Sequence, residues 1–184
     1  MAEKQLSGTR VLMVVAPEQF RDEELLEPKK ILEAQGAEVV ISSTRKGVAK
    51  GMLGATVNPD ILIVDAHAKD FDAVTVVGGM GSPDFLWSDA NLHRLLVEMH
   101  NDNKVVAGIC LSGAVLAKAG VLSGKEATVW PTPESLQVLA EGNAKYQKKP
   151  LVVDGKVITA EGPQAASDFG QAIVNLLTKS GAKV

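Results

Sequence analysis

The sequence predicts an α/β protein in which a mostly parallel sheet lies between two layers of helices. Apolar runs of strand length, rich in valine and isoleucine, recur along the 184 residues and alternate with segments of helical periodicity. Most of these runs are continuous instead of alternating with polar residues, which is typical of parallel strands buried on both faces. Strands that alternate with helices form a three-layer α/β sandwich. We expect residues 1–184 to form one domain.

The first half of the chain supplies three expected strands and one helix. The helix is bounded by Asp22, which we expect to cap its start, and by Gly36 at its C-terminal end. In order, the predicted elements are a strand at 10–16, a helix at 22–35, a strand at 37–43, a loop or hairpin around Gly47, Gly51 and Gly54 with a short strand at 55–58, and a strand at 71–77.

The second half continues the alternation. Leu92, Leu95, Leu96 and Met99 lie at the i, i+3, i+4 and i+7 positions of an amphipathic helix. The Asp154-Gly155 pair between two apolar runs indicates a β-hairpin. In order, we predict a helix at 91–101, a strand at 105–109, helices at 112–119 and 133–141, hairpin strands at 151–153 and 157–159, and a final helix at 164–179.

Composition excludes several classes of protein. The net charge of −3 and the pI of about 5.6 give no basis for a nucleic-acid or membrane partner. No apolar stretch has membrane-spanning length, and the polar N-terminus does not resemble a signal peptide. A single cysteine forbids an internal disulfide and fits a reducing compartment, so we expect a cytoplasmic protein. His67, His93 and His100 lack metal-ligand spacing, so we predict no metal site.

Cys110 is the most informative residue of the chain. It ends the apolar run Val105-Val-Ala-Gly-Ile-Cys110 and precedes a turn with Gly113, a strand–turn–helix layout typical of a nucleophile elbow. A lone cysteine in an apolar stretch is usually a small buried hydrophobe. Gly108 and Gly113, which permit close backbone approach, favour a functional thiol. Because Cys110 would lie at the positive end of a helix, we expect the pKa of its thiol to be lowered.

Three segments that leave the carboxyl ends of strands would meet at this edge of the sheet: residues 16–24, 78–84 and 110–113. Glu24 lies four residues before Pro28, which has no N–H and should kink the helix near it. We expect burial to keep the Glu24 carboxyl protonated near neutral pH, beside the thiol.

The backbone around the thiol supplies the remaining candidates. Gly78-Gly79 ends a strand, and its N–H groups could bind a developing oxyanion together with that of Leu111. Ser112 is a further candidate for substrate binding. We place Asp84, Trp130 and Arg21 at the rim of the pocket.

These residues resemble the ThiJ/PfpI superfamily, a branch of the flavodoxin-like, class I glutamine amidotransferase-like fold, over nearly the whole chain. The matching segments are Glu24-Leu-Leu-Glu-Pro28, Gly78-Gly79, Ala107-Gly-Ile-Cys110 with Gly113, Ala119-Gly-Val-Leu-Ser-Gly124, Trp130-Pro131 and Glu161-Gly162-Pro163.

The resemblance implies a reactive Cys110 paired with Glu24, oxyanion contacts from the double glycine, no cofactor, and a homodimer or larger homo-oligomer. Members assigned as peptidases carry a histidine directly after the cysteine, where this chain has Leu111. Trp130 and Glu161 stand where members often have histidine or tyrosine, and arginine. A histidine could still come from His67 or from another subunit.

The resemblance and the residues together favour a cysteine-dependent, cofactor-free enzyme of the glyoxalase or deglycase type, acting on a small reactive carbonyl or a glycated substrate. Two alternatives stay open. One is a redox-sensing or chaperone-like stress protein whose Cys110 is oxidised to a sulfinate. The other is a PfpI-type cysteine peptidase or an enzyme that hydrates small apolar electrophiles such as isocyanides.

Overall fold

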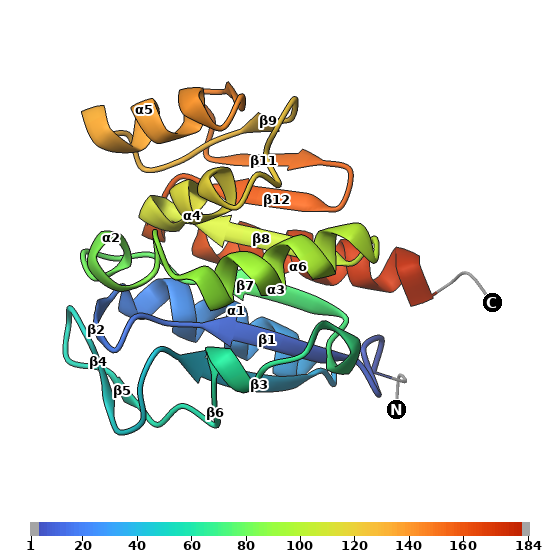
Figure 1. The fold of residues 1–184 in the computed structure, drawn as a ribbon. Coiled ribbons are helices and arrows are strands. Elements are labelled where there is room, and N and C mark those ends of the chain that lie inside the picture. Colours follow the sequence, from blue (N-terminus) through green and yellow to red (C-terminus); the bar gives the residue numbers. More distant parts are fainter. Residues whose placement is uncertain (1–3, 182–184) are drawn as a thin grey trace.

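The computed structural model describes residues 4–181 and has a seven-stranded central sheet between helical layers (Figure 1). All neighbouring strands of this sheet are parallel except the antiparallel pair β11–β12. The predicted fold class is therefore confirmed. In sheet order the strands are β11 (Leu151–Asp154), β12 (Val157–Ala160), β8 (Val105–Ile109), β7 (Ala73–Val76), β1 (Arg10–Val14), β3 (Glu38–Ser43) and β6 (Ile61–Leu62).

Helices and two small sheets surround the central sheet. The helices are α1 (Asp22–Ala34), α2 (Ser82–Phe85), α3 (Ala90–Asn101), α4 (Gly113–Lys118), α5 (Pro133–Glu141) and α6 (Ala166–Gly181). The 3-10 helices are η1 (Ile63–Asp65), η2 (Ala68–Asp70), η3 (Cys110–Ser112) and η4 (Pro163–Ala165). The small sheets join β2 (Glu18–Phe20), β4 (Ala49–Gly51) and β5 (Thr56–Val57), and β9 (Glu126–Ala127) with β10 (Lys145–Tyr146).

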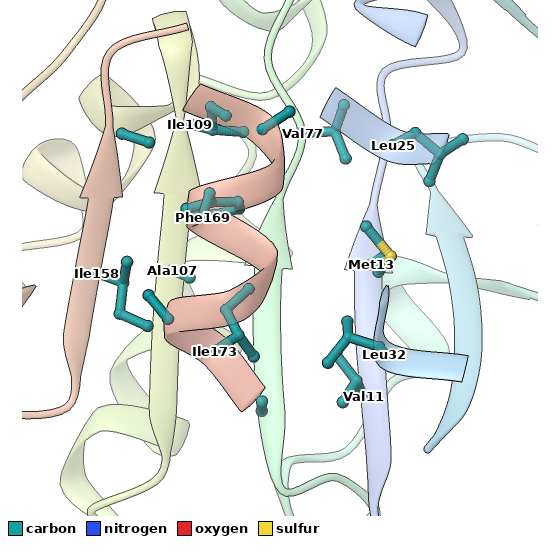
Figure 2. Close-up of a cluster of buried hydrophobic side chains, with 14 of the residues drawn as sticks. Val11, Met13, Leu25, Leu32, Val77, Ala107, Ile109, Ile158, Phe169 and Ile173 are labelled. Atoms are coloured by element: carbon teal, nitrogen blue, oxygen red, sulfur yellow. The ribbon is translucent and has the colours of Figure 1, made fainter. Parts of the chain in front are cut away.

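Each face of the sheet packs against its own helices. Helices α1 and α6 cover one face and contact each other, while α3 and α4 cover the other (Figure 1). Figure 2 shows the cluster beneath α1 and α6, where Leu25, Leu32 and Phe169 meet strand residues such as Met13 and Ala107. Because both faces of these strands are buried in this way, their sequences are largely continuous apolar runs. These runs allowed the strands to be predicted.

The crossing of α1 and α6 depends on a close approach at Pro28. A methyl group added at Gly170 of α6 would lie 2.9 Å from the Pro28 Cα atom. Helix α1 is unbroken from Asp22 to Ala34 with Pro28 inside it. The predicted kink near Glu24 stays a prediction, and the proline packs directly against the neighbouring helix.

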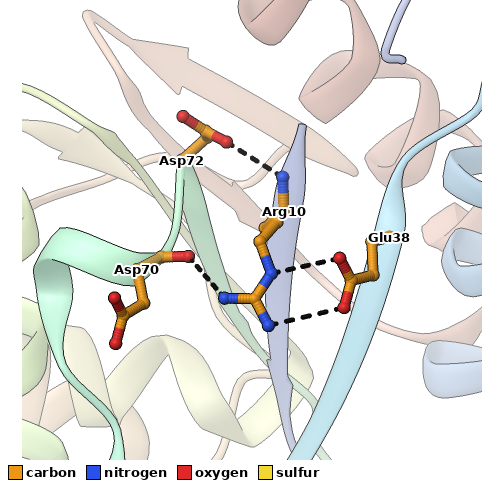
Figure 3. Close-up of polar contacts among 4 residues, drawn as sticks. All are labelled: Arg10, Glu38, Asp70 and Asp72. Carbon is orange, nitrogen blue, oxygen red and sulfur yellow. Dashed lines mark hydrogen bonds and ion pairs between the residues drawn. The ribbon is translucent and has the colours of Figure 1, made fainter. Parts of the chain in front are cut away.

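At the amino-terminal edge of the sheet, Arg10 of β1 links β3 to the segment that leads into β7 (Figure 3). Its guanidinium donates to Glu38 at 3.1 Å and to the carbonyl of Asp70 at 3.0 Å, and its backbone N–H donates to Asp72 at 2.9 Å. Because the Arg10–Glu38 pair is largely exposed, it adds little to the free energy of folding. This cluster fixes the edge opposite Cys110.

The expected cap at Asp22 is wrong. Arg21 is the N-cap residue of α1 and no side chain caps it. The Asp22 carboxylate instead accepts hydrogen bonds from the backbone N–H groups of Leu53 at 3.1 Å and Ala55 at 2.8 Å. It therefore anchors the β4–β5 hairpin to the start of α1, where the hairpin tip reaches the site described below.

The remaining differences concern element ends and short elements. The predicted helix at 112–119 begins as the 3-10 helix η3, and the helix predicted at 164–179 begins with η4. The hairpin turn lies at Gly155–Lys156, one residue later than expected. Strands of two or three residues, such as β6 and β9, carry too few residues for a periodic signal.

Candidate active site

The three segments that leave the carboxyl ends of β1, β7 and β8 lie together, as predicted. The backbone N–H of Arg21 donates to the carbonyl of Gly78 at 3.0 Å, and that of Gly81 donates to Gln19 at 3.1 Å. Gly79 has φ +108°, and a methyl group there would lie 2.4 Å from the Gln19 carbonyl oxygen. Only glycine fits this close approach of two chain segments.

Cys110 occupies a strained turn directly after β8. Its φ angle of 61° lies in the left-handed region, which is uncommon for a residue with a side chain and is typical of a nucleophile elbow. The side chain is 7% exposed. The carbonyl of Cys110 accepts a hydrogen bond from the backbone N–H of Trp130 at 3.2 Å, which places Trp130 beside the turn.

Two backbone N–H groups act on the thiol. Those of Gly79 and Leu111 both act to lower the pKa of Cys110. An oxyanion formed on a carbon bound to this sulfur would lie near the same donors. The geometry therefore brings together the two donors expected from the sequence.

Glu24 lies opposite the thiol in a fully buried position. Its side chain has no exposed surface, and neither carboxyl oxygen has a hydrogen-bond partner of good geometry in residues 4–181. The Cys110 thiol, Arg21, Glu23 and the Gly78 N–H act on its pKa. Burial raises the pKa of Glu24 to about 8, since the loss of water outweighs the opposing effects of the thiol, Arg21 and Gly78.

The expectation of a lowered thiol pKa is wrong in this geometry. Burial, with a smaller effect of the Glu24 charge, raises the pKa of Cys110 to about 12, although the N–H groups of Gly79 and Leu111 act to lower it. Helix α4 is only six residues long and begins three residues after Cys110, so its positive end contributes little. At neutral pH the thiol and the carboxyl group therefore both keep their protons.

Gly78 provides the space in which these two groups face each other. A methyl group on Gly78 would lie 2.6 Å from the Cys110 Cβ atom, 2.6 Å from the Ile109 carbonyl oxygen and 2.9 Å from Glu24 Oε2. Each distance is too short for a non-bonded contact. Any residue other than glycine would separate the carboxyl group from the thiol.

Two neighbouring clefts lie at this edge of the sheet, and Cys110 lines the smaller one. The smaller, of about 150 Å³, is mostly apolar and is lined by Arg21, Met52, Gly79, Met80, Cys110, Leu111, Trp130 and Pro163. The larger, of about 670 Å³, shares Arg21, Trp130 and Pro163 with it and carries the carboxylates of Glu161 and Asp168. The Arg21 guanidinium is held by Glu23 in two hydrogen bonds of 2.7 and 3.0 Å, which lowers the pKa of Glu23.

Trp130 and Arg21 thus line the pocket as expected, while two other candidates lie elsewhere. Ser112 is fully buried behind the turn, and its hydroxyl donates to the carbonyl of Val77 at 2.6 Å. Asp84 is exposed on α2 and does not line either cleft.

Several residues at the site had no usable signal in the sequence. Met52 comes from the tip of the β4–β5 hairpin, which the Asp22 carboxylate holds in place across 31 residues of chain. The Trp87 indole N–H donates to the carbonyl of Leu111 at 2.8 Å and supports the turn after Cys110. Gly162, which the family resemblance already included, leaves room for the Trp130 ring, which a methyl group would approach to 2.8 Å, but that contact had no signal in the sequence. All of these depend on contacts between distant segments.

No histidine of this chain completes a triad with Cys110. His67 precedes η2, which leads into the amino end of β7, so it lies at the opposite edge of the sheet. His93 is held by the carbonyl of Trp87 at 2.8 Å, and His100 lies near the end of α3.

In residues 4–181, no group of three or more His, Cys, Asp or Glu side chains is placed to hold a metal ion. Within that range, no helix has the length and apolar character needed to cross a membrane.

The fold and the site define an α/β protein with a cysteine nucleophile elbow and a buried acid partner. The chain belongs to the DJ-1/PfpI family, whose model matches residues 9–176. The predicted superfamily is thereby confirmed.

Relatives of known sequence or structure resemble the chain over most of its length. An uncharacterized protein of Methanocaldococcus jannaschii is 45% identical over 175 residues, covering 95% of this chain and 85% of that protein. A protein of Pyrococcus abyssi named a deglycase is 29% identical over 166 residues, covering 90% and 98%. The crystal structure of a ThiJ/PfpI domain protein from Brachyspira murdochii has a TM-score of 0.86 and 37% identity, covering 92% and 96% of the two chains.

Proposed function

We propose that this protein is a cofactor-free enzyme that adds the Cys110 thiol to the carbonyl group of a reactive aldehyde. The observation that carries the proposal is the buried pair itself. A thiol on a strained turn faces a carboxyl group that keeps its proton, with two backbone donors beside the sulfur. Such an arrangement suits a substrate that already has a strong electrophile and needs no fully formed thiolate.

The carboxyl group of Glu24 would serve as a proton relay. As the sulfur–carbon bond forms, one carboxyl oxygen takes the thiol proton while the other gives its proton to the carbonyl oxygen. This step gives a hemithioacetal and returns Glu24 to its protonated form. The N–H groups of Gly79 and Leu111 would hold the oxygen while its charge develops. With methylglyoxal, transfer of the C1 hydrogen to C2 as a proton would convert the hemithioacetal into a thioester of Cys110, and water would hydrolyse this thioester to lactate and the free thiol.

The two clefts fit two kinds of carbonyl substrate. The smaller, largely apolar cleft has room for a compound the size of methylglyoxal. The larger cleft offers space for the amine-bearing remainder of an early glycation adduct, and its two carboxylates would favour a cationic one. The deglycase name of the Pyrococcus abyssi relative supports the second kind.

The protonated thiol argues against two of the other functions considered from the sequence, a cysteine peptidase and a peroxide sensor. A peptidase attacks an unactivated amide and depends on a thiolate made by a nearby base, a role that no histidine fills in the described chain. A peroxide sensor also reacts through the thiolate. The cytoplasmic location and the homo-oligomer remain predictions.

Lactate formation from methylglyoxal tests the proposal. We expect Cys110→Ser to lower kcat/KM by at least about a thousandfold, because the hydroxyl cannot replace the thiol as nucleophile. The assay should contain no glutathione, so that contaminating glutathione-dependent enzymes stay silent. Ser43→Ala, which removes a buried hydroxyl elsewhere on the sheet, serves as the control and should keep its activity. Equal rates for wild type and Cys110→Ser would overturn the proposal.

A further inference from the structure

A buried pair of serine hydroxyls lies behind the nucleophile turn. The Ser112 hydroxyl donates its proton to the carbonyl of Val77 at 2.6 Å. The Ser82 hydroxyl lies 2.7 Å from that of Ser112. Since Ser112 has already given its single proton, Ser82 is the donor of this second bond. Both residues have no exposed surface.

The hydrogen bonds of the serine pair end on the Val77–Gly78 peptide, which lies against Glu24. The carbonyl of Val77 and the N–H of Gly78 belong to the same peptide unit. Gly78 lies directly against the Glu24 carboxyl group, since a methyl group on it would be 2.9 Å from Glu24 Oε2, and its N–H acts to lower the pKa of Glu24. A hydrogen bond accepted by a carbonyl polarises its peptide and makes the N–H a stronger donor. It also fixes the plane of the peptide, which at Gly78 has no side chain to restrain it.

We propose that Ser112, supported by Ser82, is a positioning residue that holds the Val77–Gly78 peptide with its N–H toward the Glu24 carboxyl group. Ser112 does not line either cleft, so it acts through Gly78 and not on the substrate. This role differs from the substrate contact expected from the sequence. The inference rests on the proposed function only in that Glu24 is the group whose proton is used there.

The other groups around Glu24 are few. Among the described residues, Arg21 and Glu23 at the start of α1 and Cys110 on η3 are the charged or titratable groups that act on it. None of these contacts Ser112 or Ser82 through a hydrogen bond. Loss of the Ser112 hydroxyl should therefore reach Glu24 through the Gly78 peptide.

Infrared difference spectroscopy tests the proposal without any substrate. The absorption of the protonated Glu24 carboxyl group, identified by its loss in Glu24→Gln, is followed from pH 5 to pH 10. We expect Ser112→Ala to move its titration midpoint upward by about half a pH unit, because a weaker Gly78 donor stabilises the carboxylate less. Ser82→Ala should cause a smaller shift in the same direction.

Ser43→Ala is the matched control, since the Ser43 hydroxyl also donates to a backbone carbonyl, that of Val15 at 2.8 Å, and this peptide is not among the groups that act on the pKa of Glu24. It should leave the midpoint unchanged. An unchanged midpoint in folded Ser112→Ala would overturn the proposal. If Ser112→Ala does not fold, an unchanged Glu24 titration midpoint in Ser82→Ala would overturn the proposal. A protein without carbonyl activity but with the expected shifts would contradict the proposed function alone.

Discussion

Replacing Glu24 by glutamine is expected to stabilise the protein at pH 8 while lowering kcat/KM at least a hundredfold. Glutamine has the same shape but cannot relay a proton, and loss of a general acid–base group costs about 10²–10⁴ in rate. The pKa of Glu24 rises from 4.5 to about 8 on folding. The wild type therefore loses stability as the pH rises from about 4.5 to about 8, by up to about 1.4 kcal/mol per pH unit.

Stability falls with rising pH because the folded and unfolded states bind different numbers of protons. Between these two pH values the folded state holds a proton on Glu24 that the unfolded state releases, so rising pH favours unfolding. Glu24→Gln has no such proton, and its advantage over the wild type should grow from pH 5 to pH 8 in urea denaturation. Glu23→Gln is the control, because Arg21 lowers the pKa of Glu23 and both states are ionised over most of that range. If the free energies of unfolding of Glu24→Gln and wild type differ by the same amount at pH 5 and pH 8, the carboxyl group is not both buried and protonated.

Gly78→Ala is expected to reduce activity at least a hundredfold and to destabilise the fold. The added methyl group would meet the Cys110 Cβ atom, the Ile109 carbonyl and Glu24 Oε2 at once, all within 3 Å. These clashes can be relieved only if the Glu24 carboxyl group and the Cys110 thiol move apart. Overpacking of this kind costs about 1–3 kcal/mol.

Gly142→Ala provides a matched steric control for this change. A methyl group there would lie 2.8 Å from the Ala117 carbonyl oxygen, between α4 and α5 and outside both clefts. We expect this variant to lose thermal stability but to keep its kcat/KM at 20 °C. If Gly78→Ala keeps wild-type activity, the role assigned to Gly78 is wrong.

The fold was predictable because its signals are local. The strands β1 and β8 are apolar runs, and β7 is apolar except for Thr75. Helix α3 carries its stripe of Leu92, Leu95, Leu96 and Met99, all buried. The convergence of Glu24, Gly78 and Cys110 also followed from the sequence, because parallel strands bring their carboxyl ends to one edge.

The rest of the site depends on contacts that no local pattern encodes. Asp22 resembles a helix cap, yet it binds backbone N–H groups more than 30 residues away. The direction of the pKa shift of Cys110 was misjudged. Burial and the facing carboxyl group set this direction, and both exist only in the folded chain. Ser112 stands next to a candidate oxyanion donor, but its side chain points behind the turn.

The pH dependence of Cys110 alkylation by iodoacetamide tests the central claim, that the thiol and the Glu24 carboxyl group both keep their protons at neutral pH. We predict that the wild-type rate keeps rising up to pH 10 without a plateau, because the pKa of Cys110 is about 12. Glu24→Gln should react severalfold faster at pH 9–10, where no carboxylate opposes the thiolate. The shape of the profile does not depend on how accessible the sulfur is. A wild-type profile with its midpoint below pH 8, or an unchanged profile in Glu24→Gln, would contradict the account.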